Sequence, residues 1–102
     1  MKSNIKTIEN NLKINFNNKK LLIQSLIHKS YNEKYNNEKL EFLGDRVIGL
    51  VIAKKLLSLY PDENEGAIDK KFAYLVNKKT CGQIGRQLNL KNFVKMGKSL
   101  RN

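Results

Sequence analysis

The spacing of apolar residues along the chain is helical nearly throughout. Apolar side chains recur every three or four positions, and no segment shows the strict alternation of a half-buried strand. The pattern therefore predicts one all-α domain, residues 1–102, built around a long third helix. The predicted helices are residues 4–16, a second helix that starts at an Asn17 cap, residues 37–60, residues 67–77 and residues 80–90.

Helix boundaries and inward faces follow from the same pattern. Pro61 ends the third helix because proline cannot continue one, and Thr80 is expected to cap the fifth. The final segment, residues 93–102, is short and is expected to fray. The residues expected to point inward on the first, second, fourth and fifth helices are Ile5, Ile8, Leu12, Leu22, Leu26, Ile68, Phe72, Leu75, Val76, Ile84 and Leu88.

The third helix contains an unusual group of carboxylates. At about 100° per residue, Glu41 and Asp45 share one face, and Glu38 lies beside them. Phe42 and Ile48 border this acidic face, so we expect the carboxylates to be partly buried. A broad apolar arc, also expected to pack inward, comprises Leu40, Leu43, Val47, Leu50 and Val51.

This arrangement needs a compensating partner. Like charges four residues apart destabilise an isolated helix by roughly 0.2–0.5 kcal/mol, and partial burial costs more. The partner could be lysine or arginine, or a hard divalent cation, which prefers carboxylate oxygens. Gly44 would let a second backbone or a ligand approach. The spacing alone leaves an ordinary solvated face open.

Composition narrows the class of protein. The chain has 102 residues, of which 40% are hydrophobic, as in a single globular domain. Its longest apolar stretch, residues 47–53, is too short to span a bilayer, and its start lacks the apolar region of a signal peptide. A single cysteine, Cys81, cannot form an intramolecular disulfide. We therefore expect a cytoplasmic protein without a membrane partner.

Charge suggests a polyanionic partner. The formal net charge is +11, and after Asp69 nine lysines and arginines follow without an acidic residue. Such a basic block favours nucleic acid, because lysine and arginine neutralise phosphates. An alternative is compositional bias: 17 Lys, 14 Asn and 9 Ile are also what an A/T-rich genome would produce. Charge alone does not decide between the two.

The acidic segment resembles the signature of the ribonuclease III family. The similarity runs through "NEKLEFLGDRV", residues 37–47, and includes the acids, the aromatic residue and the glycine. Residues 21–31 resemble the helix and loop before that signature, and residues 65–80 resemble the segment after it. The resemblance covers about residues 5–98.

The resemblance implies a helical endonuclease domain that works as a homodimer. Its members cleave double-stranded RNA, leaving 5′-phosphate and 3′-hydroxyl ends, and serve rRNA and mRNA processing or decay. They use magnesium, with manganese as a possible substitute, and no small-molecule cofactor. A metal-assisted hydrolysis does not require the only histidine, His28, which we interpret as structural.

The resemblance also implies roles for single residues. Glu41 resembles the metal-binding glutamate and Asp45 the essential aspartate, so both are candidate catalytic and metal residues. Glu38 and Glu65 resemble supporting acids near the cleavage site, although each could simply stabilise a helix N-terminus. Phe42 resembles an aromatic residue of the dimer interface, although it could be ordinary core.

The sequence departs from the family pattern at its end. The family continues with a second carboxylate pair on a later helix, whereas the last acidic residue here is Asp69. We expect no double-stranded-RNA-binding domain in this chain, and Phe72 stands where arginine is common in the family. We therefore expect a domain that is incomplete at its C-terminus, holds half of a metal site and does not cleave RNA alone.

Three explanations of this departure remain open. The chain is a fragment of a complete enzyme, a degenerate member that binds RNA without cutting it, or one part of an enzyme whose other acids come from a separate polypeptide. In the second case the protein is a non-catalytic RNA-binding module with the same fold.

Overall fold

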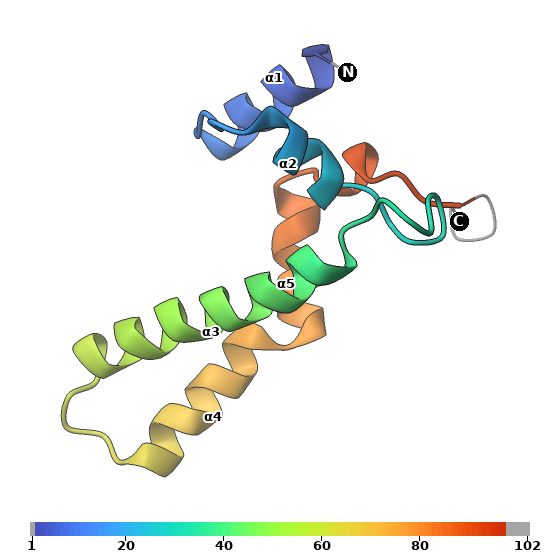
Figure 1. Cartoon of the computed structure of the whole chain (residues 1–102). Helices are drawn as coiled ribbons and strands as arrows, with labels where there is room; N and C mark the ends of the chain where they lie inside the picture. The colour runs from blue at the N-terminus through green and yellow to red at the C-terminus, as the bar shows by residue number, and fades with distance from the viewer. Residues whose placement is uncertain (1, 98–102) are drawn as a thin grey trace.

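The computed structural model describes residues 2–97 and consists of helices joined by short connections (Figure 1). Within this range the one extended pairing is an isolated parallel bridge between Ile27 and Lys95. The predicted all-α class is confirmed; the end of the last segment, residues 98–102, lies outside the described residues. The elements are α1 (Lys2–Leu12), α2 (Lys19–Ser25), α3 (Glu38–Leu59), α4 (Glu65–Val76), α5 (Lys78–Gln87) and the 3₁₀ turn η1 (Lys91–Phe93).

Asparagine side chains set the starts of α2 and α4. Asn18, not the predicted Asn17, caps α2 by accepting the Leu21 N–H at 3.1 Å. Asn64 accepts the Ala67 N–H at 2.9 Å, so α4 begins at Glu65, two residues before the predicted start. In both cases the side-chain oxygen satisfies an N–H that has no partner within the helix.

The cap of α5 was also predicted at the wrong residue. Asn77, not Thr80, is the cap, and its side-chain oxygen accepts the Thr80 N–H at 2.7 Å. The Thr80 hydroxyl instead donates to the Tyr74 carbonyl at 2.8 Å. Thr80 thus lies inside the first turn and ties α5 back to the end of α4.

The best-buried part of the molecule is the corner where α1 meets α2, which we call the amino-terminal corner. Ile8 is only 1% exposed, and Leu22 and Ile27 are also buried. Glu9 is buried beside them, where its carboxylate pairs with Lys19. Besides this ion pair, the Phe16 N–H donates to the same carboxylate at 2.6 Å, which fixes the turn between the two helices.

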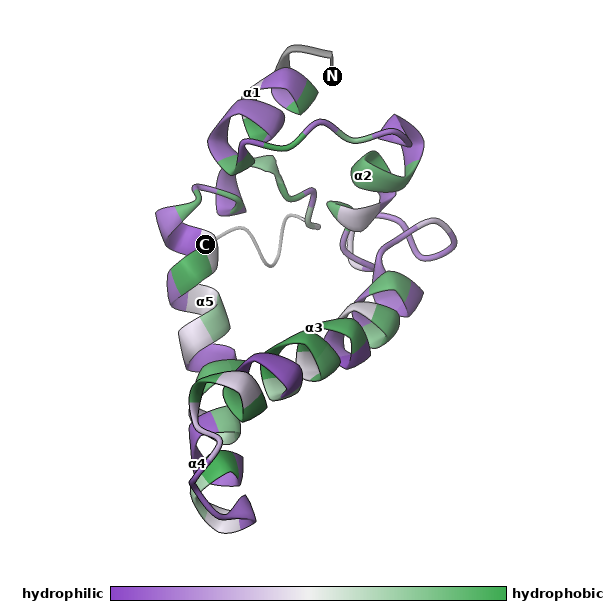
Figure 2. Ribbon diagram, turned by 90° about the vertical axis from the view of Figure 1, so that its left-hand side faces the viewer, coloured by the Kyte–Doolittle hydropathy of each residue, from purple (hydrophilic) through white to green (hydrophobic). Residues whose placement is uncertain are grey.

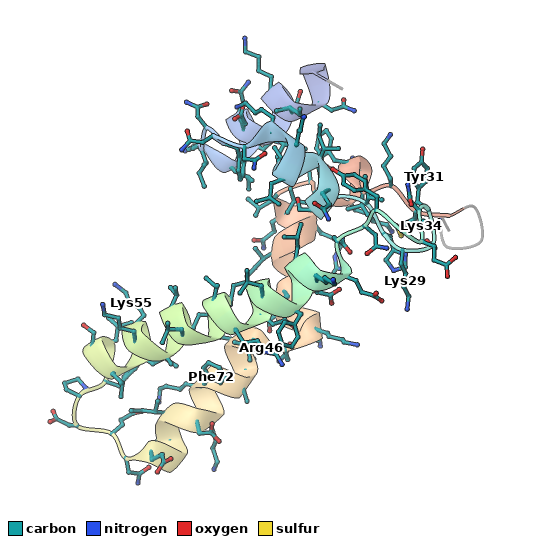
Figure 3. The ribbon with its side chains drawn as sticks, in the orientation of Figure 1. Lys29, Tyr31, Lys34, Arg46, Lys55 and Phe72 are labelled. Carbon is teal, nitrogen blue, oxygen red and sulfur yellow. The ribbon has the colours of Figure 1, made fainter. Side chains whose placement is uncertain are left out.

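The connection from α2 to α3 is held at both ends. The His28 N–H donates to the Lys95 carbonyl at 2.8 Å, and the Asn37 N–H donates to the Ile27 carbonyl at 2.8 Å. The His28 ring contacts the Ser30 hydroxyl at 2.7 Å, in agreement with a structural role for this histidine. Lys29 and Lys34 project outward from this loop (Figure 3).

Helices α3 and α4 form an antiparallel hairpin that extends away from the rest of the chain (Figure 1). The Cα radius of gyration is 16.0 Å, whereas a compact domain of about 100 residues has about 13 Å. Leu56 is buried in the hairpin, where it lies near Tyr74 and Leu75.

The apolar arc expected to pack inward on α3 is mostly exposed. Figure 2 shows hydrophobic residues along the length of this helix. Leu50, the most exposed of them, is 72% accessible. The prediction of burial was wrong because helical spacing shows which residues share a face, not whether another segment covers it. We call the exposed set the outer face of α3: Leu43, Val47, Leu50, Val51 and Leu57.

Candidate active site: a carboxylate groove between three helices

Glu41 and Asp45 line an open groove of about 460 Å³ formed by α3, α4 and α5, which we call the carboxylate groove. The two acids lie on the α3 side, one helical turn apart, as predicted from their spacing. Lys78 and Cys81 line the groove from α5. The remaining lining residues are apolar or small: Ile48, Gly49, Phe72 and Val76.

Phe72 forms the link between α3 and α4 at this groove. A Cβ atom at Gly49 would lie 3.5 Å from its ring, an ordinary van der Waals distance, so the ring packs directly against α3 at this position. Figure 3 shows Phe72 between the two helices. The groove therefore combines an apolar floor with charged groups on two of its sides.

The carboxylates are available for a ligand. Both Glu41 and Asp45 are exposed, so the expected partial burial was wrong. Within residues 4–97 neither acid takes part in an ion pair. The compensating lysine or arginine considered from the sequence is thus not among their described contacts. Apart from the backbone of its own helix and its chain neighbours, Gly44 has no described atom within 4 Å of the position its Cβ would take, so no other backbone segment approaches there.

The other candidate residues lie outside the groove. Glu38 is in the first turn of α3 and pairs with Lys29 at 3.4 Å, with both side chains well exposed. Glu65 is in the first turn of α4, near the opposite end of the α3–α4 hairpin. Both positions suit the favourable interaction of a carboxylate with a helix N-terminus.

Phe42 is exposed on the surface and not in the core. It is 61% accessible, and the Arg46 guanidinium lies 4.0 Å from the centre of its ring. Arg46 also donates to the Phe42 carbonyl at 3.3 Å. An aromatic residue this exposed, with a cation over its ring, remains able to contact a second protein surface.

The groove offers part of a metal site. In residues 4–97 no three His, Cys, Asp or Glu side chains come together in a way that could hold a metal ion. Magnesium, however, is commonly bound through one or two carboxylates, several waters and substrate phosphates. Glu41 and Asp45 therefore fit magnesium as a partial ligand set and do not form a closed protein site.

Two lining residues with functional side chains, Lys78 and Cys81, were not candidates from the sequence. Lys78 was counted only as one member of the basic block, and Cys81 only as an unpaired cysteine. Their place in the groove depends on how α5 folds back after Asn77, which local spacing does not reveal. The sequence predicts Phe72 as an inward residue of the fourth helix and as a departure from the family pattern, but its place in the lining of the groove comes from the structure.

Comparison with solved structures identifies the class of this fold. The nuclease domain of ribonuclease III from Campylobacter jejuni superimposes with a TM-score of 0.89 and 42% sequence identity, over 93% of this chain and 66% of that chain. That domain shows structural flexibility in a region involved in its dimer formation. A second structure of the same domain gives a TM-score of 0.88 at 43% identity, over 94% of this chain and 65% of that chain. The fold is that of a helical nuclease domain.

The sequence comparisons agree with this class. A family model described as Ribonuclease-III-like matches residues 18–102. Ribonuclease 3 of Pelagibacter ubique is 56% identical over 94 residues, which are 92% of this chain and 42% of that protein. Ribonuclease 3 of Campylobacter jejuni is 44% identical over 91% of this chain and 42% of that protein. The chain belongs to the ribonuclease III family.

The chain spans less than half the length of these curated relatives. The described residues include no helix that is long and apolar enough to cross a membrane.

Proposed function

We propose that this chain is part of the catalytic domain of an endoribonuclease that cleaves double-stranded RNA with magnesium. The observation that carries the proposal is the pair of free carboxylates, Glu41 and Asp45, in an open groove of a nuclease-domain fold. The proposed products carry 5′-phosphate and 3′-hydroxyl ends, and the proposed substrates are rRNA precursors and mRNA. A cytoplasmic location suits this role.

In this proposal Glu41 and Asp45 hold the metal from the α3 side of the groove. Magnesium, when bound, activates water and neutralises charge on the attacked phosphate. Manganese is the alternative ion, since it accepts the same oxygen ligands. Glu38 and Glu65 are proposed as supporting acids that shape the field around the RNA, because neither lines the groove.

Metal binding tests the ligand assignment directly. We expect the 102-residue chain to bind manganese weakly, and Asp45→Asn to abolish that binding because it removes a carboxylate charge. Asp69→Asn is the matched control, since Asp69 is exposed on α4 outside the groove. Electron paramagnetic resonance of free manganese measures both. Equal losses in the two variants would contradict a site in the groove.

Cleavage tests the activity. The 102-residue polypeptide alone is expected to cut no duplex RNA, because it supplies only one carboxylate pair. A chimera that joins it to the remaining part of the Pelagibacter ubique relative is expected to cut duplex RNA when magnesium is present. Asp45→Asn should remove that activity, and Asp69→Asn should keep it. Robust magnesium-dependent cleavage by the 102 residues alone would contradict the expected inactivity.

The second candidate function is a non-catalytic RNA-binding module. It is favoured by the absence of a three-residue metal cluster among residues 4–97 and by the net charge of +11. Its expected result is a chimera that does not cleave, together with duplex RNA binding by the chain that Glu41→Ala leaves unchanged.

We propose a homodimer in which the surface around Phe42 meets its counterpart. The exposure of Phe42 and of the outer face of α3 supports this, because large apolar surfaces mark contact sites. Phe42→Asp is expected to lower self-association in sedimentation experiments. Tyr74→Asp, which changes an aromatic residue on α4 that is also well exposed, should not lower self-association. A sharp monomer at high concentration would contradict the dimer.

A further inference from the structure

Among the residues that the structure describes, Lys78 is the one cation that lines the carboxylate groove. It extends from the first turn of α5, whereas Glu41 and Asp45 line the groove from α3. The groove thus has negative charge on one side and positive charge on another. Its floor contains Ile48 and Phe72, and apolar walls of this kind strengthen charge interactions inside a cleft.

The ammonium group of Lys78 is not used by a neighbouring acid. The ion pairs within residues 4–97 involve Lys19, Lys29 and Lys71, and none involves Lys78. Residues 70–102 contain no aspartate or glutamate, so α5 itself offers no acidic side chain to Lys78. Lys78 is also exposed, so its ammonium can reach a ligand that enters the groove.

The cap of α5 fixes the position of the Lys78 backbone. The Asn77 side chain accepts the Thr80 N–H at 2.7 Å, and its amide donates to the Tyr74 carbonyl at 3.0 Å. The Cys81 N–H donates to the Asn77 carbonyl at 3.1 Å. These bonds hold the turn between α4 and α5 and therefore hold the backbone of Lys78 at the edge of the groove.

Two carboxylates by themselves repel a phosphodiester. A cation on another side of the same groove would attract it and orient it toward the acids, because a lysine ammonium acts on phosphate as a compact point charge. We propose that Lys78 binds a backbone phosphate of duplex RNA in the carboxylate groove, facing the Glu41–Asp45 pair. This inference rests on the proposed function and adds a substrate-binding residue to it.

Lys79 provides the control. It is the next residue, exposed and of equal charge, but it does not line the groove. Loss of either lysine lowers the net charge by one, so a purely non-specific attraction predicts equal effects for Lys78→Gln and Lys79→Gln. A phosphate contact in the groove predicts a larger effect at Lys78, and it predicts that Lys78→Arg keeps most of the binding.

The experiment measures binding of a short RNA duplex to the 102-residue chain by fluorescence anisotropy, with calcium present and salt varied. Lys78→Gln is expected to weaken binding several-fold and to lower the slope of log affinity against log salt by about one. Lys79→Gln should change both less. Equal effects of the two substitutions, or no salt-dependent binding by the unmodified chain, would overturn the assignment of Lys78.

Manganese binding distinguishes this failure from failure of the proposed function. Suppose that Asp45→Asn removes manganese binding while the two lysine variants bind RNA equally. That result would support the proposed metal site and contradict the proposed role of Lys78. If Asp45→Asn leaves manganese binding unchanged while Lys78→Gln alone weakens RNA binding, Lys78 contacts phosphate in a groove that is not the proposed metal site. Lys78→Gln should itself keep manganese binding, because it removes a positive charge near the ion.

Discussion

The amino-terminal corner and the outer face of α3 both carry aliphatic side chains at helical spacing, but only the corner buries them. Ile8 is 1% exposed, whereas Leu50 is 72% exposed. In the corner, α1 and α2 cover each other, and Phe93 from the distant end of the chain also lines the small cavity beside Ile8. The outer face of α3 is turned away from α4. The same residue types therefore stabilise one region and leave the other available for contact.

The acids of the two regions differ in the same way. Glu9 in the corner is bound by Lys19 and by the Phe16 N–H, and it closes a turn. Glu41 and Asp45 are exposed and lack ion-pair partners among the described residues. A carboxylate with its bonding capacity filled supports the fold, whereas a pair without partners can take a ligand. This contrast supports the groove as the candidate site.

The largest test of the contrast is truncation of one aliphatic side chain in each region. Ile8→Ala is expected to lower the free energy of unfolding by about 2–5 kcal/mol, because it leaves a cavity in a filled site. Leu50→Ala should change it by less than about 0.5 kcal/mol, because the side chain is already in water. Urea unfolding at equal protein concentration measures both.

If Ile8→Ala does not fold, Ile8→Val with an expected loss of about 0.5–1.5 kcal/mol serves instead. A large loss for Leu50→Ala would show that the outer face of α3 is covered in solution, and the contrast would fail.

A smaller effect is expected where the carboxyl-terminal segment meets the loop after α2. A Cβ atom at Gly97 would lie 2.7 Å from the Ser30 carbonyl oxygen, and the Gly97 N–H donates to the Ser30 hydroxyl at 2.9 Å. Gly97→Ala must therefore push two backbone segments apart. We expect a loss of about 1–3 kcal/mol, in the range of overpacking substitutions, measured by urea unfolding. No loss would mean that this contact is not maintained in solution.

The pH dependence of stability probes the buried acid of the corner. The hydrogen bond from the Lys19 ammonium, helped by the Phe16 N–H, lowers the pKa of Glu9 below its ordinary value of 4.5. Because the pKa is lower in the folded chain than in the unfolded one, the resulting stability is present above pH 4.5 and is lost as pH falls through the folded-state pKa.

Glu9→Gln should therefore flatten the decline of the urea midpoint between neutral and acidic pH. Glu33→Gln is the control, since Glu33 is exposed in the loop between α2 and α3 and forms no ion pair within residues 4–97. Equal pH profiles for Glu9→Gln and the unmodified chain would contradict the structural role of this carboxylate.

The contrast between the two regions also explains what the sequence predicted well. Helical spacing identified the five α-helices found within residues 2–97. The four-residue interval placed Glu41 and Asp45 on one face. Both predictions depend only on local geometry. Starts of helices were less reliable where several capping residues competed. Asn77 outcompetes Thr80 because it lies three residues earlier and its side chain reaches the free N–H of the first turn.

Burial and the far side of the groove could not be predicted in this way. The spacing of apolar residues on α3 is the same whether or not another segment covers them. Periodicity alone therefore predicted that Leu50 is buried, which was wrong. Lys78 reaches the groove only through the turn at Asn77 and the packing of α5, which join residues far apart in the sequence. The buried Glu9 was missed for the same reason, since its partner Lys19 lies on another helix.

The smallest expected effect is a gain of stability on α3. Apart from its own helix backbone and chain neighbours, no described atom lies within 4 Å of the position that a Cβ atom would take at Gly44, and the helix continues on both sides of it. Gly44→Ala should therefore stabilise the chain by about 0.5–1 kcal/mol, because alanine loses less backbone entropy in a helix than glycine. Urea unfolding measures this change, with the Gly97→Ala variant measured in the same way for comparison. A loss at Gly44 would mean that a second copy of the chain approaches α3 there, and its dependence on protein concentration would reveal that contact.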